Sequence, residues 1–413
     1  MYNSLTQKIE PFHLAQNKQV KMYTCGPSTY QRPHIGNYRT FLFEDILQRY
    51  LEYLGYSVTR LITLTNIEDK AINWAEIANI TVEELTSRNE EIFFEEFEQL
   101  RIKRPQFTVR ASTIVDQAVK LIQTLIAKGV AYKYTYRGAH NVYFDPLKFE
   151  GFGKLARLDM KKWPKTRHRF HLDTYPGMPW HLGDFVLWRG CHAHERVCWD
   201  TELGRGRPAW NVQDAAMVTK HLGFSIDIAC GGVDNLVRHH DYTLAVAEAA
   251  SGEPFARFWL HGGHLYVDGK KMSKSQGNVL YLDELVAKDY YGAAVRFFLI
   301  YGAYRKKLNF TWEALAESSR KLDNCQALIR ELQNNQTANA PSTNQAKKAV
   351  QNLLPTFEKH MNNDLDAKSA FDAVYATVAL LVEFKRKKAL GKAELDAAID
   401  ALRRIDSVLQ VLF

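Results

Sequence analysis

Residues 23–55, YTCGPSTYQRPHIGNYRTFLFEDILQRYLEYLG, contain the pattern that decides the fold. The apolar segment Val20–Cys25 leads into them and predicts a buried strand. A loop with glycine and proline follows, and then apolar residues recur at helical spacing, which predicts a helix capped at its end by Gly55. The β-branched run Ser57–Thr65 predicts a second strand. This is a βαβ unit, so a ligand is expected in the loop Gly26–Asn37, beyond the carboxyl end of the first strand.

The rest of the chain extends this unit into a larger α/β domain. After Arg207 the pattern predicts a helix closed by Gly223, a strand at Ser225–Ala229 and a helix from Asp241. We therefore predict an α/β, Rossmann-like domain with an inserted subdomain, followed by an all-α helical bundle. The expected limits are 1–110 for the first half of the α/β domain, 111–185 for the inserted subdomain, 186–310 for the second half and 311–413 for the bundle. The polar segment Asn334–Gln345 is expected to be a linker.

The composition indicates a soluble chain with a sizeable core. Of its 413 residues, 46% are hydrophobic and 24% are charged. No apolar run approaches the roughly 20 residues that span a bilayer, and the N-terminus lacks the pattern of a signal peptide. A cytoplasmic protein is therefore expected. The net charge of +8 favours phosphate-bearing ligands, and nearly all of the basic excess precedes Thr311.

The cysteines are odd in number and widely scattered, which argues against a disulfide framework and predicts free thiols. The five are Cys25, Cys191, Cys198, Cys230 and Cys325. Two histidines, His192 and His194, lie close to Cys191 and Cys198, but the spacing is irregular for a zinc knuckle. We therefore interpret this stretch as a surface loop with incidental side chains. Cys230 is interpreted as a small buried thiol.

Two short motifs carry the chemistry. The first, PHIGN at residues 33–37, stands at the start of the first helix, where unpaired backbone N–H groups can bind phosphate. The second, KMSKS at residues 271–275 followed by QGN, puts two lysines and two hydroxyls on a glycine-bounded loop. At ~5% per residue, a specified five-residue string arises by chance in about one chain of this length in ten thousand. The second motif is therefore a strong signal.

In this order the two motifs resemble the two signatures of class I aminoacyl-tRNA synthetases. Further stretches resemble cysteinyl-tRNA synthetase, collinearly and over nearly the whole chain. They are YTCGPSTYQRPHIGNYRTF at 23–41, TNIEDKA at 65–71, DFVLW at 184–188, GRPAW at 206–210, GGVDN at 231–235 with the following His239-His240, and HGGHLYVDGKKMSKSQGN at 261–278.

The resemblance implies an ATP-dependent ligase that uses ATP and Mg²⁺ to form an aminoacyl adenylate and then passes the acyl group to an acceptor. His34 and Asn37 would stabilise the phosphates, and the lysines of the second motif, Lys271 and Lys274, would hold the leaving pyrophosphate. Other residues that the resemblance puts at the ATP are Gly26, Gly36, Gly231, Gly232, Asp234, Ser273 and Ser275. Residues that it puts at the amino acid are Thr65, Trp210 and Asp214.

The family also binds zinc, through two cysteines, a histidine and a glutamate, and this zinc recognises the substrate thiol. Cys25 and His239 stand at two of these positions, whereas Asp214 replaces the second cysteine and Thr243 replaces the glutamate. Cys25, Asp214 and His239 can still hold Zn²⁺ with an open fourth position. The alternative is that no metal binds and that Asp214 pairs with a cationic group of a different amino acid.

The acceptor is the least defined part of the prediction. The sequence ends after the helical bundle, where a cysteinyl-tRNA synthetase usually continues into a domain that reads the anticodon. With the altered metal ligands, this resembles the mycothiol-pathway cysteine ligases, so the leading prediction is a small-molecule amine acceptor. One alternative is a true cysteine–tRNA ligase of reduced size, favoured by the net charge and the basic run Lys161–His171, although a solvated loop explains that run more simply. Another is a non-catalytic nucleotide-binding paralogue, against which the intact His34 and lysines argue.

Overall fold

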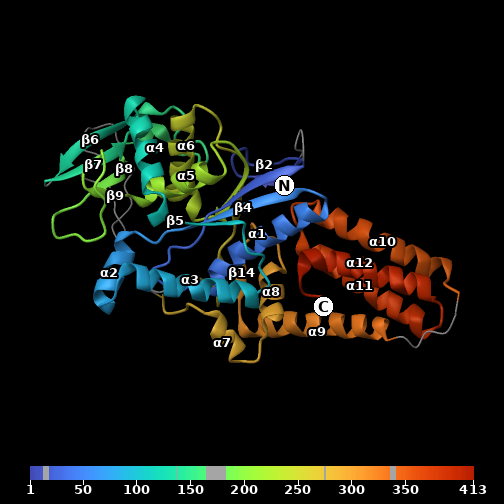
Figure 1. Cartoon of the computed structure of the whole chain (residues 1–413). Coiled ribbons are helices and arrows are strands. Elements are labelled where there is room, and N and C mark those ends of the chain that lie inside the picture. The colour runs from blue at the N-terminus through green and yellow to red at the C-terminus, as the bar shows by residue number, and fades with distance from the viewer. Residues whose placement is uncertain (13–17, 137, 164–182, 274–275, 335–340) are drawn as a thin grey trace.

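The computed structural model describes residues 1–12, 18–136, 138–163, 183–273, 276–334 and 341–413. Figure 1 shows a parallel sheet at the centre, an antiparallel sheet with three helices at one end, and a bundle of long helices at the other. Among the described residues, no helix is both long and apolar enough to span a bilayer.

The central sheet has five parallel strands in the order β11-β10-β3-β4-β5. Because all five run the same way, the loops that follow β3 and β10 meet at one edge, and Cys25 N donates a hydrogen bond to Cys230 O at 3.0 Å there. The strands are β3 (Gln19–Thr24), β4 (Ser57–Leu64), β5 (Phe107–Arg110), β10 (Ile226–Gly232) and β11 (Ala256–Gly262). The predicted parallel, Rossmann-like sheet is confirmed.

One face of this sheet is covered by α1 (Ile35–Tyr53), which connects β3 to β4. Gly55, just beyond the end of α1, has φ 84° and takes the left-handed conformation, as the cap position predicts. Alternate side chains of the strands enter two separate cores. Cys230 of β10 faces the core that contains α1, whereas the neighbouring Ala229 faces the core on the other side.

The connection from β4 to β5 consists of α2 (Asp69–Ala78) and α3 (Val82–Gln99). Thr81 and Glu84 form a capping box that starts α3. Phe93 of α3 packs its ring against Tyr38 and Phe41 of α1. α3 therefore packs against the N-terminal part of α1.

The opposite face of the parallel sheet is covered by three helices, α4 (Val115–Ala127), α5 (Trp210–His221) and α6 (Asp241–Ser251). Beyond them lies an antiparallel sheet in the order β6-β7-β8-β9, formed by β6 (Ala131–Tyr136), β7 (Ala139–Phe144), β8 (Phe185–Gly190) and β9 (Gly206–Pro208). It takes strands from both sides of residue 185, and the domain limits given above remain predictions. Only Ala209 separates β9 from α5, so this sheet fixes the start of α5.

After Phe310 the chain is helical, as predicted. A sheet of β12 (Leu265–Val267), β13 (Lys270–Lys271) and β14 (Leu308–Phe310) and two helices, α7 (Leu282–Val286) and α8 (Gly292–Ile300), lead into the bundle. The bundle contains α9 (Trp312–Gln333), α10 (Asn344–Met361), α11 (Ala367–Arg386) and α12 (Lys392–Leu409). α10 begins inside the segment predicted as a linker, of which residues 335–340 lie outside the described residues. Shorter elements are β1 (Tyr2–Asn3), β2 (Lys8–Ile9), the 3₁₀ turns Ala111–Thr113, Pro146–Lys148 and Met160–Lys162, and a π-helical turn, Leu236–His240.

A buried arginine ties the bundle to the α/β domain. Arg296 of α8 is fully buried and forms an ion pair with Asp45 of α1 at 2.6 Å. It also donates hydrogen bonds to Leu409 O at the end of α12 and to Leu100 O at the end of α3, at 2.7 and 3.0 Å. A buried cation is tolerated only when its donors are satisfied, so these contacts fix where the bundle packs.

The prediction of free thiols is wrong for two of the cysteines. Cys191 and Cys198 form a disulfide, whereas Cys25, Cys230 and Cys325 are free and buried. The pairing follows from the β8–β9 hairpin, in which Gly190 lies opposite Gly206 and the connecting loop folds back on itself. Sequence spacing alone does not reveal that closure.

Candidate active site

The first part of the candidate site is the N-terminus of α1. His34 Nδ1 accepts a hydrogen bond from Asn37 N at 3.3 Å, and Asn37 Oδ1 accepts one from His34 N at 3.0 Å. This capping box fixes both side chains at the end of the helix where the dipole favours an anion. A Cβ on Gly36 would lie 3.0 Å from the His34 ring and 3.6 Å from Met272 Sδ. The glycine therefore lets the first motif pack closely against the second.

The loop before α1 is held against β4. A Cβ on Gly26 would lie 1.7 Å from Thr63 O, so the backbone approach there requires glycine. Thr65 N donates to Pro27 O at 3.2 Å, and Thr65 O accepts from Thr29 N at 3.0 Å. Thr65, expected at the amino acid, thus supports the loop through its backbone.

The second motif follows the hairpin of β12 and β13. Lys271 is exposed, whereas Met272 is buried beneath the loop. Asn278 closes the loop, because its Oδ1 accepts from Ser273 N at 2.9 Å and its Nδ2 donates to Lys271 O at 3.3 Å. Ile35 N donates to Leu280 O at 3.0 Å, which joins the start of α1 to the segment after the motif. Lys274 and Ser275 lie outside the described residues.

The third part is the end of β10, which includes the predicted Gly231 and Gly232. Asp234 follows after Val233 and is exposed, with its Oδ1 2.6 Å from where a Cβ on Gly232 would lie. His264 is close enough to interact electrostatically with both Asp234 and Lys271. Burial lowers the pKa of the His264 imidazole, and the Lys271 cation lowers it further, whereas Asp234 opposes the shift. His264 therefore lies close to both Asp234, at the end of β10, and Lys271 of the second motif.

Beside these parts lies a buried cluster of Cys25, Asp214 and His239, whose candidate ligand atoms all lie within 4.8 Å of one another. Asp214 Oδ2 is 2.5 Å from His239 Nε2 and accepts from Cys25 Sγ at 3.6 Å. Tyr23 OH also donates to Asp214 Oδ2, at 2.6 Å, and Asn235 Nδ2 donates to Cys25 Sγ at 3.2 Å. Three separate segments, the end of β3, α5 and the turn after β10, thus converge on one carboxylate and one thiol.

The cluster contains an ion pair between the buried Asp214 and the partly exposed His239. Burial raises the pKa of Asp214, but the His239 charge and hydrogen bonds from His239, Tyr23 and Thr63 lower it more, so that the net shift is downward. Burial lowers the pKa of His239, but Cys25 and Asp214 raise it well above its ordinary value. Burial raises the pKa of the Cys25 thiol, and Asp214 raises it further. The carboxyl group of Asp214 is therefore more acidic than usual and the imidazole of His239 more basic, so the two groups stabilise each other as an ion pair.

Two further predicted residues surround His239. The Trp210 ring stacks on the His239 ring with centroids 5.3 Å apart and planes 9° apart. Thr243 Oγ1 donates to His239 O at 3.0 Å, the back-bond that a threonine makes within a helix. Because the hydroxyl is engaged with the backbone, Thr243 does not join the cluster, and the donor set is sulfur, oxygen and nitrogen from three side chains. This set suits Zn²⁺ with one open position.

The structure adds a site residue that the sequence analysis did not assign. Glu68, at the start of α2, is 8% exposed, and its Oε1 has no hydrogen-bond partner among the described residues. Burial raises the pKa of Glu68 to about 7, while Lys70 and His239 oppose the shift and Asp69 adds to it. Glu68 and His264 both lie in stretches that resemble the family, but their burial and neighbours are not readable from one sequence.

The chain is similar to known proteins along its whole length. Residues 11–320 match the family model of tRNA synthetases class I (C), catalytic domain. The cysteine–tRNA ligase of Chlamydia pneumoniae is 36% identical over 413 residues, covering 100% of this chain and 86% of the relative. That of Protochlamydia amoebophila is 32% identical over 415 residues, covering 100% and 85%.

Solved structures show the same fold at low identity. Mycobacterium tuberculosis methionyl-tRNA synthetase in complex with methionyl-adenylate matches with a TM-score of 0.67 at 17% identity, covering 96% of this chain and 90% of that chain. The ternary complex of Agrobacterium radiobacter K84 agnB2 LeuRS with tRNA and LeuAMS matches with a TM-score of 0.69 at 12% identity, covering 97% and 85%. At such identities the likeness concerns the fold.

Proposed function

Because the chain belongs to the class I cysteinyl-tRNA synthetase family, we propose that it activates cysteine with ATP and transfers it to tRNA. Membership of the family makes it an ATP-dependent ligase. The observation that carries the finer proposal is the cluster of Cys25, Asp214 and His239 at the edge of the sheet where α1 begins. The cluster supports a pocket in which the thiol of the substrate lies next to the sulfur of Cys25 and the imidazole of His239, close to the adenylate.

The proposed acceptor is tRNA. Relatives named cysteine–tRNA ligases align along the whole chain, which covers 86% of the length of the Chlamydia pneumoniae relative. The sequence analysis favoured a small-molecule amine, but nothing in the comparisons or in the described residues supports that acceptor, so it is not retained.

In the activation step, a carboxylate oxygen of the amino acid attacks the α-phosphorus of ATP, and the bond to pyrophosphate breaks. Negative charge develops on the phosphates, so preorganised donors and cations should dominate catalysis. His34 and Asn37 hold the helix N-terminus ready for the phosphates, and Lys271 and Lys274 neutralise the leaving pyrophosphate. Asp234 accepts hydrogen bonds from the ribose hydroxyls. Mg²⁺, when bound, would neutralise negative charge on the phosphates.

Cys25, Asp214 and His239 are the residues that would hold Zn²⁺ in the amino-acid pocket. The ion would supply a Lewis acid that favours the thiolate form of the substrate. Asp214 Oδ2 is bonded to Tyr23 and His239, whereas its Oδ1 is buried without a hydrogen-bond partner among the described residues, so this oxygen could ligate a metal or pair with a substrate cation. Ligation requires neutral imidazole and thiolate, so metal uptake would release protons from His239 and Cys25.

Amino-acid-dependent ATP–pyrophosphate exchange tests this proposal. All twenty amino acids are compared, zinc content is measured in parallel, and tRNA charging follows with the amino acid that supports exchange. We expect exchange with cysteine, charging of its tRNA, and a loss of about 10²- to 10³-fold in the Lys274→Ala variant. Exchange with another amino acid alone would contradict the thiol pocket, and exchange without charging would contradict tRNA as acceptor.

A further inference from the structure

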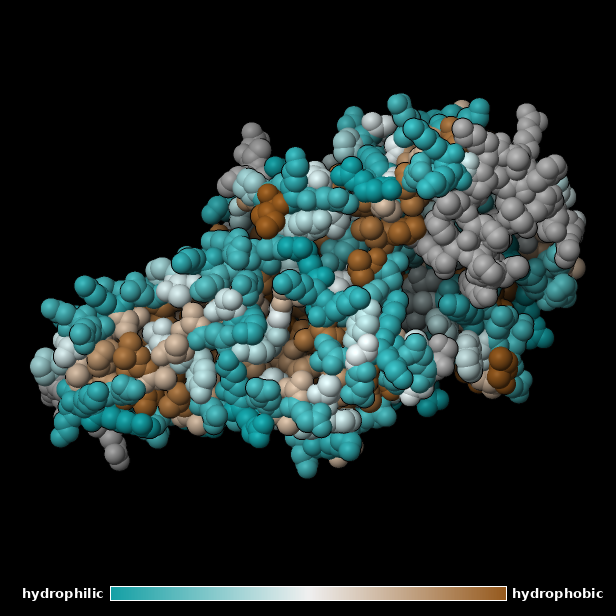
Figure 2. Space-filling view, turned by 180° about the vertical axis from the view of Figure 1, so that it is seen from behind, coloured by the Kyte–Doolittle hydropathy of each residue, from teal (hydrophilic) through white to brown (hydrophobic). Residues whose placement is uncertain are grey.

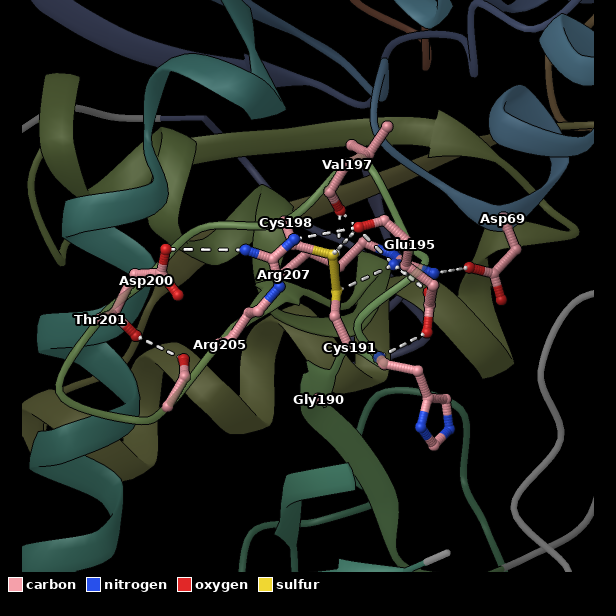
Figure 3. The surroundings of a disulfide bond; sticks show 12 residues. Asp69, Gly190, Cys191, Glu195, Val197, Cys198, Asp200, Thr201, Arg205 and Arg207 are labelled. Carbon is pink, nitrogen blue, oxygen red and sulfur yellow. Dashed lines mark hydrogen bonds and ion pairs between the residues drawn. A yellow bond between two sulfur atoms is a disulfide. The ribbon is translucent and has the colours of Figure 1, made fainter. Parts of the chain in front are cut away.

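The loop between β8 and β9 carries the Cys191–Cys198 disulfide, shown in Figure 3. Both cysteines are partly exposed, and the intervening His192, Ala193, His194 and Arg196 are exposed. The disulfide therefore lies in a partly exposed loop. The three other cysteines are buried.

A buried cation stands beside this disulfide. The guanidinium of Arg207, which is 3% exposed, lies between the disulfide and Asp69 in Figure 3. Its Nη1 is 3.3 Å from Cys191 Sγ and donates to Glu195 Oε2 at 2.8 Å, while its Nη2 donates to Asp69 Oδ1 at 2.7 Å. A cation next to a sulfur stabilises the thiolate, which is both the nucleophile and the leaving group in disulfide exchange.

Glu195 also lies near both sulfur atoms, so a metal site has to be weighed against exchange chemistry. Burial raises the pKa of Glu195, but hydrogen bonds from Arg207 and from His192 N lower it more. The carboxylate is therefore charged and already engaged by a guanidinium that also touches Cys191. Because a cation occupies this position, thiol exchange fits the site better than metal binding.

Contacts lead from the disulfide to the amino-acid pocket. Asp69, held by Arg207, begins α2 directly after Glu68. Gln213 of α5 donates to Ile67 O at 3.2 Å and to Pro208 O at 3.0 Å. Gln213 is fully buried and adjoins Asp214 in the chain. Arg207 thus links the disulfide loop to the start of α2, and Gln213 links the segment before α2 to α5, the helix that carries Asp214.

We propose that Cys191 and Cys198 are a redox-active pair that exchanges with low-molecular-weight thiols and disulfides, and that Arg207 transmits the state of the pair to α5. In oxidation, the Cys191 thiolate attacks a small disulfide and releases one thiol, and the Cys198 thiolate then displaces the second. Two electrons pass from the protein to the small disulfide, and the two released thiolates take up the protons that Cys191 and Cys198 lost. After reduction, the Cys191 thiolate competes with Glu195 for Nη1 of Arg207, and a shift of the guanidinium changes the bond from its Nη2 to Asp69.

Thiol trapping across a series of reduced-to-oxidised glutathione ratios tests the exchange. The full chain is equilibrated at each ratio, alkylated and analysed by peptide mass spectrometry, with Cys325→Ser as a control for a buried thiol. We expect one reversible transition that involves Cys191 and Cys198 alone. A pair that stays reduced or stays oxidised at every ratio, or that is masked by a bound metal after reduction, would overturn the proposal.

Hydrogen exchange of α5, Trp210–His221, tests transmission without relying on activity. We expect faster exchange in the reduced protein, and no redox-dependent difference in the Cys191→Ser/Cys198→Ser double variant or when Arg207→Gln removes the link. The KM for the amino acid in pyrophosphate exchange, a readout that rests on the proposed function, should shift by about two- to thirtyfold. If no amino acid supports exchange, the proposed function fails while the trapping and hydrogen-exchange results still decide this one. Unchanged α5 exchange would overturn transmission.

Discussion

The candidate site has two halves that meet at the same edge of the parallel sheet, one proposed for the nucleotide and one for the amino acid. They differ in whether their charged side chains are exposed or paired. The half proposed for the nucleotide consists of hydrogen bonds between side chains and backbone around His34 and Asn278, with the charges of Lys271 and Asp234 left exposed. The half proposed for the amino acid has its charges paired with each other, at the buried Asp214 and the partly exposed His239. The exposed charges of the first half are accessible to a ligand, whereas the paired charges of the second half stabilise the folded structure. Substitutions should therefore separate rate from stability.

The largest expected effect is on stability, from Asp214→Ala. Removing the buried partner leaves His239 without its counter-charge and should lower the unfolding free energy by about 3 kcal/mol, the low end for a buried pair because His239 is partly exposed. Denaturant unfolding at pH 7 measures it. Asp234→Ala, which removes the exposed carboxylate of the other half, is the matched control and should change stability by less than about 0.5 kcal/mol. Equal losses in the two variants would break the comparison.

The next effect is on rate, from Lys271→Ala. Losing a cation that stabilises developing charge on the pyrophosphate should lower kcat for pyrophosphate exchange by about 10²- to 10³-fold, with unfolding unchanged. Steady-state kinetics and a parallel unfolding curve measure both quantities. Lys270→Ala changes the adjacent exposed lysine of β13 and should keep most of the activity. Similar losses for both lysines would mean that the charge of the loop as a whole, and not Lys271, is required.

The sequence predicted the nucleotide half better than the amino-acid half, and the reason is local. β3, α1 and β4 follow from hydrophobic periodicity and from Gly55, and the helix N-terminus at His34 follows with them. The proximity of Cys25, Asp214 and His239 depends on contacts across about two hundred residues, and family resemblance alone suggested it. Glu68, the Cys191–Cys198 pairing and the back-bond of Thr243 were missed because burial, loop closure and hydroxyl direction are not encoded in spacing.

Glu68 provides a pH test of the buried half. Its pKa is raised from the ordinary 4.5 to about 7, so between these values the folded chain binds more protons than the unfolded chain. The unfolding free energy should therefore fall as pH rises through this window, by up to about 3 kcal/mol. Glu68→Gln should remove that contribution and be more stable than the parent at pH 8. Glu76→Gln, at an exposed position of the same helix, should follow the parent at every pH, and a Glu68→Gln curve parallel to the parent would contradict the assignment.

The smallest expected effect concerns Trp210, whose ring lies parallel to His239 and also faces Tyr242, with centroids 6.0 Å apart. Trp210→Leu keeps an apolar side chain but removes the ring over the imidazolium, a contact worth about 0.5–1.5 kcal/mol. If the ring positions His239 for the amino acid, the KM should rise by about two- to twelvefold while kcat stays near the parent value. Trp210→Phe keeps an aromatic ring and should recover part of the loss, whereas Trp74→Leu, on the exposed side of α2, should have no effect. An unchanged KM in Trp210→Leu would mean that the ion pair with Asp214 alone orients His239, and the contrast between the two halves would then rest on charge and not on aromatic packing.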